Sequence, residues 1–316
     1  MTAPASANTS TEERSRPAPR IGAAWLMVLA SFLFATMGVC VKLASAQYDA
    51  GEIVFYRGMT GALLMLVFAR WNGGTVATKV PAMHFWRSLS GVCALTLWFY
   101  AIGGLPLPTA MTLNYMSSVW MAMFLIGGAV MLGRSRVDGR LVAAVLVGFV
   151  GVALILRPTL ERDQLWHGVV GLLSGMLSAM AYLQVTALGR AGEPEERVVF
   201  YFSMGGMLAG ALTTVVGGLH SHTPFGVLML LATGVLATVA QLLMTRAYAT
   251  GRPLVNASLA YLGIAYSCVF GYWLFDDPIT PMALAGMVLV VAAGIAATRL
   301  RQSVAPTDTE ASTLES

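Results

Sequence analysis

Long apolar runs alternate with short polar stretches along nearly the whole chain. Ten runs approach or exceed about 20 residues, the length that a helix needs to cross the hydrocarbon core of a membrane. In lipid these runs must be helices, because every backbone polar group needs a partner within the protein. The expected spans cover residues 21–43, 51–68, 85–104, 108–131, 141–156, 168–188, 198–216, 225–249, 254–275 and 281–297.

The second half of the chain repeats landmarks of the first half in the same order. The string Val54-Phe-Tyr-Arg-Gly-Met59 in the second span has a counterpart, Val199-Phe-Tyr-Phe-Ser-Met204, in the seventh. Three further pairs, 143 to 147 positions apart, are Pro106 with Pro253, Tyr115 with Tyr261 and Gly151 with Gly294. Because each copy holds five spans, the second copy must be inverted relative to the first, as in many secondary transporters. Chance similarity between apolar segments is the alternative.

These patterns predict an all-α integral membrane protein with ten transmembrane helices arranged as two inverted five-helix repeats. The repeats are expected over residues 21–157 and 166–301, and substrate is expected to bind near the midplane where they meet. The polar tails at residues 1–20 and 302–316 are expected to be disordered and cytoplasmic.

Composition and charge support a membrane protein and orient it. Hydrophobic residues make up 57% of the chain and charged residues only 11%, whereas soluble domains carry about 25% charged residues. Fifteen of the 19 lysines and arginines, Arg87 among them, fall at span ends on one side, against three on the other. The positive-inside rule therefore predicts cytoplasmic termini in a plasma membrane, such as a bacterial inner membrane. Cations spread over span ends do not form a nucleic-acid patch.

From residue 21 to residue 301 the chain resembles the drug/metabolite transporter superfamily, in its EamA-type branch. The resemblance rests on the ten spans, the two repeats, Val54-Phe-Tyr-Arg57-Gly and the Leu105-Pro-Leu-Pro string before the fourth span. It implies transport of solutes such as amino acids, nucleotide-like metabolites or vitamins. Many members have Gly-Glu just after the fourth and ninth spans, where this chain has Gly-Arg134 and Asp-Asp277.

Polar and aromatic residues near the middle of the spans are the candidate substrate site. A broad ring with one polar tip suits an amphipathic solute, and Ser or Asn can bind polar groups. The alternative is that these residues pack helices together or form the interfacial belt. The predicted substrate-binding residues are Arg57, Trp98, Tyr100, Asn114, Ser118, Tyr182, Gln241, Tyr261 and Tyr266.

Ionisable residues inside spans are rare, and they suggest function by default. Arg57, in the second span, could bind a substrate carboxylate or phosphate with its planar fork. Alternatively it snorkels or pairs with Glu52 to hold the helix end. Lys42 is expected near the same mouth, and Glu52 is an alternative proton site. No Asp or Glu falls in the middle of a predicted span.

The favoured function is secondary transport of a small organic metabolite by alternating access, with export or exchange preferred because no ion-coupling residue is evident. Concentrative uptake of a cofactor-like solute, such as riboflavin or S-adenosylmethionine, is one alternative, and a non-transporting membrane scaffold is another. No enzyme motif, cofactor site or metal-ligand spacing is found. The expected partners are a small-molecule substrate and the lipid bilayer, with a homodimer as one possibility and no nucleic acid.

Overall fold

The structure of the protein, a computed structural model, describes residues 22–71, 73–131, 139–159, 162–250, 259–277 and 279–304. Within these residues every regular element is a helix. The helices of the first half are α1 (Ala23–Ala44), α2 (Ala50–Trp71), α3 (Pro81–Gly104), α4 (Leu107–Tyr115), α5 (Ser117–Met131) and α6 (Gly139–Thr159). Those of the second half are α7 (Arg162–Arg190), α8 (Glu195–Gly217), α9 (Pro224–Thr250), α11 (Leu262–Phe275) and α12 (Pro281–Val304).

The eleven helices of the described residues correspond to the ten predicted spans, because α4 and α5 share one span. Five of them are long and apolar enough to cross a membrane by themselves: Ala23–Ala44, Ala50–Trp71, Gln164–Arg190, Glu195–Gly217 and Pro224–Ala247. Large apolar side chains face outwards, as Leu212, Val215 and Val216 do on α8. Such a surface suits lipid rather than water. The prediction of an all-α membrane protein is confirmed.

One predicted span is interrupted. The expected continuous helix over 108–131 breaks at Met116, where the N–H bonds carbonyl groups three and four residues back and the helix restarts at Ser117. A second turn lies at Tyr261, just before α11, near the equivalent point of the other half. Residues 254–258, the beginning of the ninth predicted span, lie outside the described residues. In secondary transporters, interrupted helices often border the substrate site.

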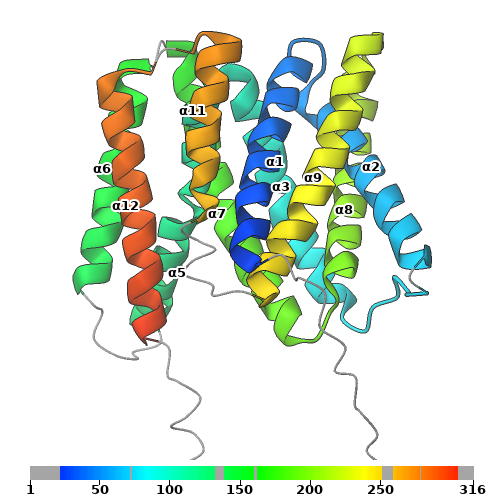
Figure 1. Ribbon diagram of the computed structural model, residues 1–316, viewed down its shortest axis with the longest axis horizontal. Helices are drawn as coiled ribbons and strands as arrows, with labels where there is room; N and C mark the ends of the chain where they lie inside the picture. Colours follow the sequence, from blue (N-terminus) through cyan, green and yellow to red (C-terminus); the bar gives the residue numbers. More distant parts are fainter. Residues whose placement is uncertain are drawn as a thin grey trace, which may run out of the picture.

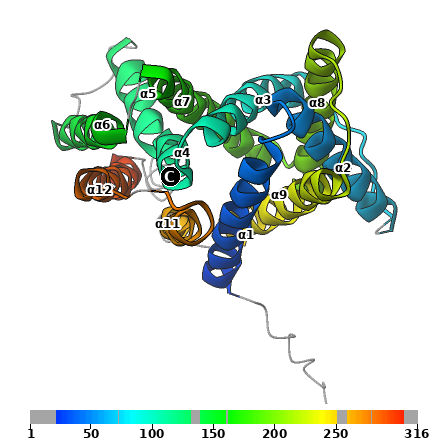
Figure 2. The same cartoon turned by 90° about the horizontal axis from the view of Figure 1, so that it is seen from above.

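The helices pack in a pattern that is unchanged when the two halves are exchanged. The most extensive contacts join α2 with α8, α6 with α12, α1 with α9, and α3 with α7. If α1, α2, α3 and α6 correspond to α7, α8, α9 and α12, exchange returns the same four pairs. Figure 2 shows α2, α8 and α9 on one side of the molecule, α6 and α12 on the other, and α1 and α3 between them.

The first residue of α1 and the last residue of α12 lie at the same end of the bundle (Figure 1). We call this the terminal end and the opposite one the distal end. The connections α1–α2, α3–α4, α8–α9 and α11–α12 are at the distal end. The connections α2–α3 and α7–α8 are at the terminal end.

Candidate substrate cavity

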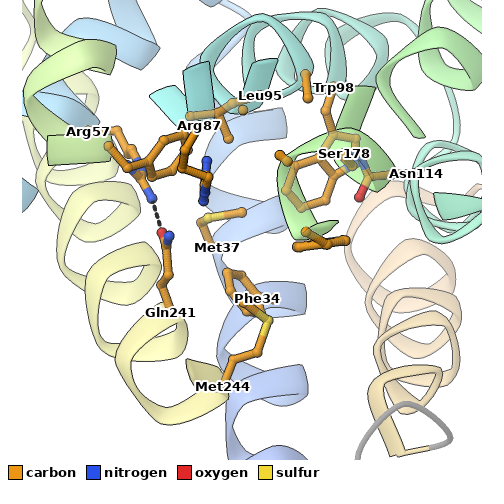
Figure 3. Close-up of a pocket in the computed structure, with 15 residues that line it drawn as sticks. Phe34, Met37, Arg57, Arg87, Leu95, Trp98, Asn114, Ser178, Gln241 and Met244 are labelled. Atoms are coloured by element: carbon orange, nitrogen blue, oxygen red, sulfur yellow. Dashed lines mark hydrogen bonds between the residues drawn. The ribbon is translucent and has the colours of Figure 1, made fainter. Parts of the chain in front are cut away.

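A cavity of about 80 Å³ lies between helices of both halves (Figure 3). It is bounded by α1, α2, α3 and α4 of the first half and by α7, α8 and α9 of the second. Its lining residues are Phe34, Met37, Arg57, Arg87, Gly91, Ala94, Leu95, Trp98, Asn114, Ser178, Ala181, Tyr182, Phe202, Gln241 and Met244. Most of the wall is apolar, so its few polar groups stand out.

Two arginines from neighbouring helices dominate the polar part of the wall. Arg57 on α2 and Arg87 on α3 are 2% and 4% exposed. Their guanidinium carbons lie 4.6 and 4.2 Å from the ring centroid of Phe202 on α8. Arg57 Nη2 donates a 2.6 Å hydrogen bond to Gln241 Oε1, drawn as the dashed line in Figure 3. Nε and Nη1 of each arginine are buried without a hydrogen-bond partner.

Arg87 is the residue that reasoning from the sequence placed wrongly. It was expected among the cations at the cytoplasmic span ends, yet it lies inside α3 and lines the cavity. Helix α3 begins at Pro81, four residues before the predicted span, because Pro is well suited to the first helical turn. A usable signal was present, since Arg87 falls within the predicted span 85–104 and an intramembrane cation suggests function.

One of the structural roles expected of Arg57, the ion pair with Glu52, is not observed. The suggested pair with Glu52 is not formed, because the Glu52 carboxylate is 2.8 Å from Nδ1 of His220 at the distal end. In the described part of the chain no carboxylate lies within ion-pair distance of Arg57 or Arg87. Both cations therefore contact the ring of Phe202, and Arg57 also bonds the amide of Gln241, but among the described residues neither has a counter-charge.

The opposite wall of the cavity is built next to the helix break. Asn114 on α4 donates 3.2 Å hydrogen bonds to Ser174 and Ser178 on α7. Trp98 on α3 presents a buried indole Nε1–H with no partner. Helix α7 can approach this closely because Gly175 faces the backbone of α4, where an added Cβ would lie 2.5 Å from a carbonyl oxygen.

The nine predicted binding residues divide into two groups. Arg57, Trp98, Asn114, Tyr182 and Gln241 line the cavity. The remaining four are not among its lining residues, so their role in binding stays a prediction without support from this geometry.

Each of these four residues lies elsewhere in the bundle. Tyr100, 40% exposed, stacks on His167 with ring centroids 4.6 Å apart. Tyr266 on α11 meets Phe32 edge-on, at a centroid distance of 5.4 Å. Tyr261 is buried, with its ring 5.9 Å from that of Tyr115, and Ser118 is half-buried on α5. Helix periodicity did not reveal this, because it does not say which neighbour each helix face will meet; α11, for example, packs on α1 and α4 but contributes no lining residue.

An ion pair closes the distal end above α4. Lys42 Nζ on α1 lies 2.9 Å from both carboxylate oxygens of Asp277 and 3.2 Å from the carbonyl oxygen of Leu105. Asp277 also accepts a 2.8 Å hydrogen bond from the backbone N–H of Leu107, the first residue of α4. Asp276 ends α11 with φ +49°, a left-handed turn that brings Asp277 back to α1. Asp277, the acid of the second repeat, thus links α1, the start of α4 and the end of α11.

A second distal cluster joins the first two turns of α2 to the α8–α9 connection. Glu52 accepts a 2.8 Å hydrogen bond from His220, and Tyr56 lies 2.6 Å from Nε2 of His222. The hydrogen bond to Glu52 raises the pKa of His220 and outweighs desolvation, which would lower it.

We expect this contact to weaken at high pH. A raised folded-state pKa gives stabilisation that is complete below the ordinary histidine pKa of about 6.5 and is lost as the pH rises through the raised value. The melting temperature of the wild type should therefore fall between about pH 6 and pH 9 more than that of His220→Gln. Thermal unfolding of both proteins across this range tests it, and identical pH profiles would contradict it.

A third cluster closes the terminal end. Glu193, in the α7–α8 connection, lies 3.0 Å from Nε2 of His84 and 3.1 Å from Nη1 of Arg197, whose Nη2 donates to the carbonyl oxygen of Thr75. Burial alone would raise the pKa of Glu193. Hydrogen bonds from His84, Arg197 and Thr78 outweigh it and lower the pKa. This contribution to stability is therefore lost as the pH falls through the lowered value, the opposite direction to the distal cluster.

The clusters at the two ends occupy equivalent places in the two halves. The offset of 145 positions that aligns the repeated strings relates Glu52 to Arg197 and Thr75 to His220. One end is held by the Glu52–His220 contact and the other by the Arg197–Thr75 contact. At the distal end the start of α2 contacts the loop after α8, and at the terminal end the start of α8 contacts the loop after α2. The same two segments therefore meet at both ends, with the two halves exchanged.

A ten-span membrane bundle, broken near equivalent points of its halves and enclosing a partly polar cavity between them, defines a small-solute transporter. Comparison with known proteins agrees, because the model of the EamA-like transporter family matches residues 21–157. The chain belongs to the EamA-like transporter family, within the drug/metabolite transporter superfamily. This confirms the resemblance that the motifs suggested.

The relatives are named as transporters, and they match most of the chain. The pseudopaline exporter CntI of Pseudomonas aeruginosa is 32% identical over 284 residues, which cover 88% of this chain and 96% of the relative. An uncharacterized transporter of Helicobacter pylori is 24% identical, covering 85% and 92%. An S-adenosylmethionine uptake transporter of Rickettsia bellii is 20% identical, covering 86% and 91%.

A solved crystal structure supports the fold. It superimposes with a TM-score of 0.62 at 16% sequence identity, covering 90% of this chain and 99% of the other. At this identity the likeness concerns the fold alone.

Proposed function

We propose that the protein exports a small organic metabolite across a bacterial plasma membrane by alternating access through the central cavity. The observation that carries this proposal is the cavity itself, which lies between the two halves and holds unpartnered polar groups. Buried polar groups without partners are costly, so they suggest a ligand that completes them. The terminal end would face the cytoplasm, following the distribution of lysines and arginines.

The size of the cavity fits a closed intermediate of the transport cycle. Ligand pockets for small molecules usually enclose about 300–1,000 Å³, well above the 80 Å³ found here. A metabolite would therefore enter only after one end has opened. Because equivalent clusters hold the two ends, opening the terminal cluster while the distal cluster stays closed, and then the reverse, gives alternating access.

Export is favoured over uptake because the relative at 32% identity is named an exporter. Uptake is the second candidate, since another relative is named an uptake transporter. Vesicles of both orientations separate the two. If the protein exports, inverted vesicles should accumulate a metabolite that right-side-out vesicles do not, and the reverse result would support uptake.

The test begins with the metabolites that appear in the medium of bacteria expressing the protein. At least one solute should rise with the wild type and fall back with Asn114→Ala, which removes the hydrogen bonds to Ser174 and Ser178. Leu212→Ala, on a side chain that is 69% exposed on the lipid-facing surface of α8, is the matched control and should behave like the wild type. No change in any solute, with folded protein in the membrane, would favour the scaffold alternative.

A further inference from the structure

We propose that the transported solute is an organic dianion, carrying two carboxylates or one phosphate monoester, and that Arg57 and Arg87 bind its oxygens. This rests on the proposed transport function and names the substrate class of the same cavity. The two guanidinium groups come from α2 and α3 of the first half, and both lie against the ring of Phe202 on α8 of the second half.

The net positive charge of the cavity lining favours an anionic solute. Two cations, 2% and 4% exposed, have no carboxylate within ion-pair distance among the described residues. Buried charges are stable only when they are paired and hydrogen-bonded. A solute with two negative charges would neutralise both cations, whereas a solute with net positive charge would add to the repulsion. S-adenosylmethionine, with its sulfonium cation, therefore fits this cavity poorly.

The unpartnered hydrogen-bonding groups of the cavity lining also favour an anionic solute. Among the lining residues, five buried groups lack a partner, and all five are N–H donors: Nε and Nη1 of Arg57, the same two atoms of Arg87, and Nε1 of Trp98. A ligand that completes this set must supply acceptors. Carboxylate and phosphate oxygens supply acceptors alone, and they match the planar fork of a guanidinium. A neutral amide or alcohol would bring donors that these groups cannot accept.

The arginines are held ready for a ligand. Gln241 occupies one nitrogen of Arg57 and leaves the others free, and Phe202 supports both guanidinium planes. Gly91 lies one helical turn beyond Arg87, and a Cβ there would overlap Arg87 Nη1. The glycine thus makes room for the guanidinium against α3, so the side chain needs little rearrangement on binding.

The first experiment measures melting temperature with test solutes on purified full-length protein in detergent. Succinate, glutarate, adipate and glycerol 3-phosphate are compared with glutaramide, the uncharged diamide. At least one dianion should raise the melting temperature by roughly 5 °C at saturation, and glutaramide should not. Response to the dicarboxylates or to the phosphate ester tells which oxyanion is bound. No shift with any dianion, or an equal shift with glutaramide, overturns the proposal.

Variants test whether the two arginines are responsible. Arg57→Gln and Arg87→Gln should each reduce the affinity for the dianion about 10- to 100-fold, the effect of losing a charged hydrogen-bond donor. Without solute, both variants should melt no lower than the wild type, because an uncompensated buried charge has been removed. A merely structural role predicts the opposite, namely a lower melting temperature and an unchanged anion response.

Gly91→Ala displaces Arg87 without changing any charge. The guanidinium is the end of a flexible side chain, so it should move while the helix stays in place. We expect anion affinity to fall by about tenfold or more while the unliganded protein remains folded. Gly128→Ala, where an added Cβ meets nothing within 4 Å, is the matched control and should bind like the wild type.

The secretion assay distinguishes this proposal from transport itself. A neutral or cationic solute exported through the cavity, with no dianion bound, would leave the transport function standing and overturn the dianion. A dianion that binds through both arginines but is moved in neither vesicle orientation would support the site and overturn transport.

Discussion

Replacing Asp277 by asparagine is expected to lower the free energy of unfolding by about 3–5 kcal/mol, the usual cost of removing one partner of a buried ion pair. Its carboxylate side chain is 10% exposed, and that of Lys42 is 16% exposed. The uncharged amide of the variant would leave the ammonium group of Lys42 near α4 without its counter-charge. It would also be a weaker acceptor for the N–H of Leu107. Unfolding in a titration with denaturing detergent measures the loss.

The neighbouring carboxylate provides a control within the same turn. Asp276→Asn removes an exposed charge, and Asn adopts the left-handed conformation at φ +49° about as readily as Asp. Its effect should stay within about 0.5 kcal/mol. The double variant Lys42→Met with Asp277→Asn should recover part of the lost stability, because no unpaired charge remains. Equal losses in Asp276→Asn and Asp277→Asn would contradict the structural role assigned to this ion pair.

Gly58→Ala is expected to destabilise the protein by about 3 kcal/mol, because it forces α2 away from α8. An added Cβ at Gly58 would overlap the backbone nitrogen of Met207 and come within 2.6 Å of the carbonyl oxygen of Ser203. Backbone atoms cannot turn aside as a side chain can. The α2–α8 pair is the most extensive contact in the bundle, so its separation should lower the melting temperature in detergent.

Another glycine on the same interface is the control. An added Cβ at Gly206 would meet nothing closer than 3.8 Å. Gly206→Ala should therefore be neutral or should stabilise the helix by up to about 1 kcal/mol, the difference in helix propensity. Gly210→Ala, which would meet the backbone of Phe55, should resemble Gly58→Ala. Similar melting temperatures for all three variants would contradict the close approach of α2 and α8.

The membrane-spanning fold could be predicted because it follows from local properties of the chain. An apolar run of about 20 residues must form a helix in lipid, wherever it packs. The break at Met116 could not be predicted in this way, because the polar residues beside it, Asn114, Ser117 and Ser118, are also compatible with a continuous transmembrane helix. The early start of α3 at Pro81 was missed because its first turn is less apolar than the rest of the span.

The candidate site was predicted in part, and its errors have a common cause. Arg57, Asn114 and Gln241 face the cavity as expected, whereas Tyr261 and Tyr266 lie on α11 and its preceding turn, away from it. Polarity and depth identify a residue that needs a partner, but they do not say which neighbour its helix face will meet. Arg87 was overlooked because it was treated as an interfacial charge rather than as a residue inside its span.

The sequence by itself determined that the chain enters a membrane, how many spans it has, which strings recur and to which family it belongs. Only the tertiary structure decided which polar groups come together. Arg57 and Arg87 lie thirty positions apart on two helices, and they share the ring of Phe202 on a third. Such a meeting depends on the rotation of each helix and on close glycine contacts between distant spans. Hydropathy is a property of single segments, so it predicts neither the rotation of a helix nor the contacts between distant spans.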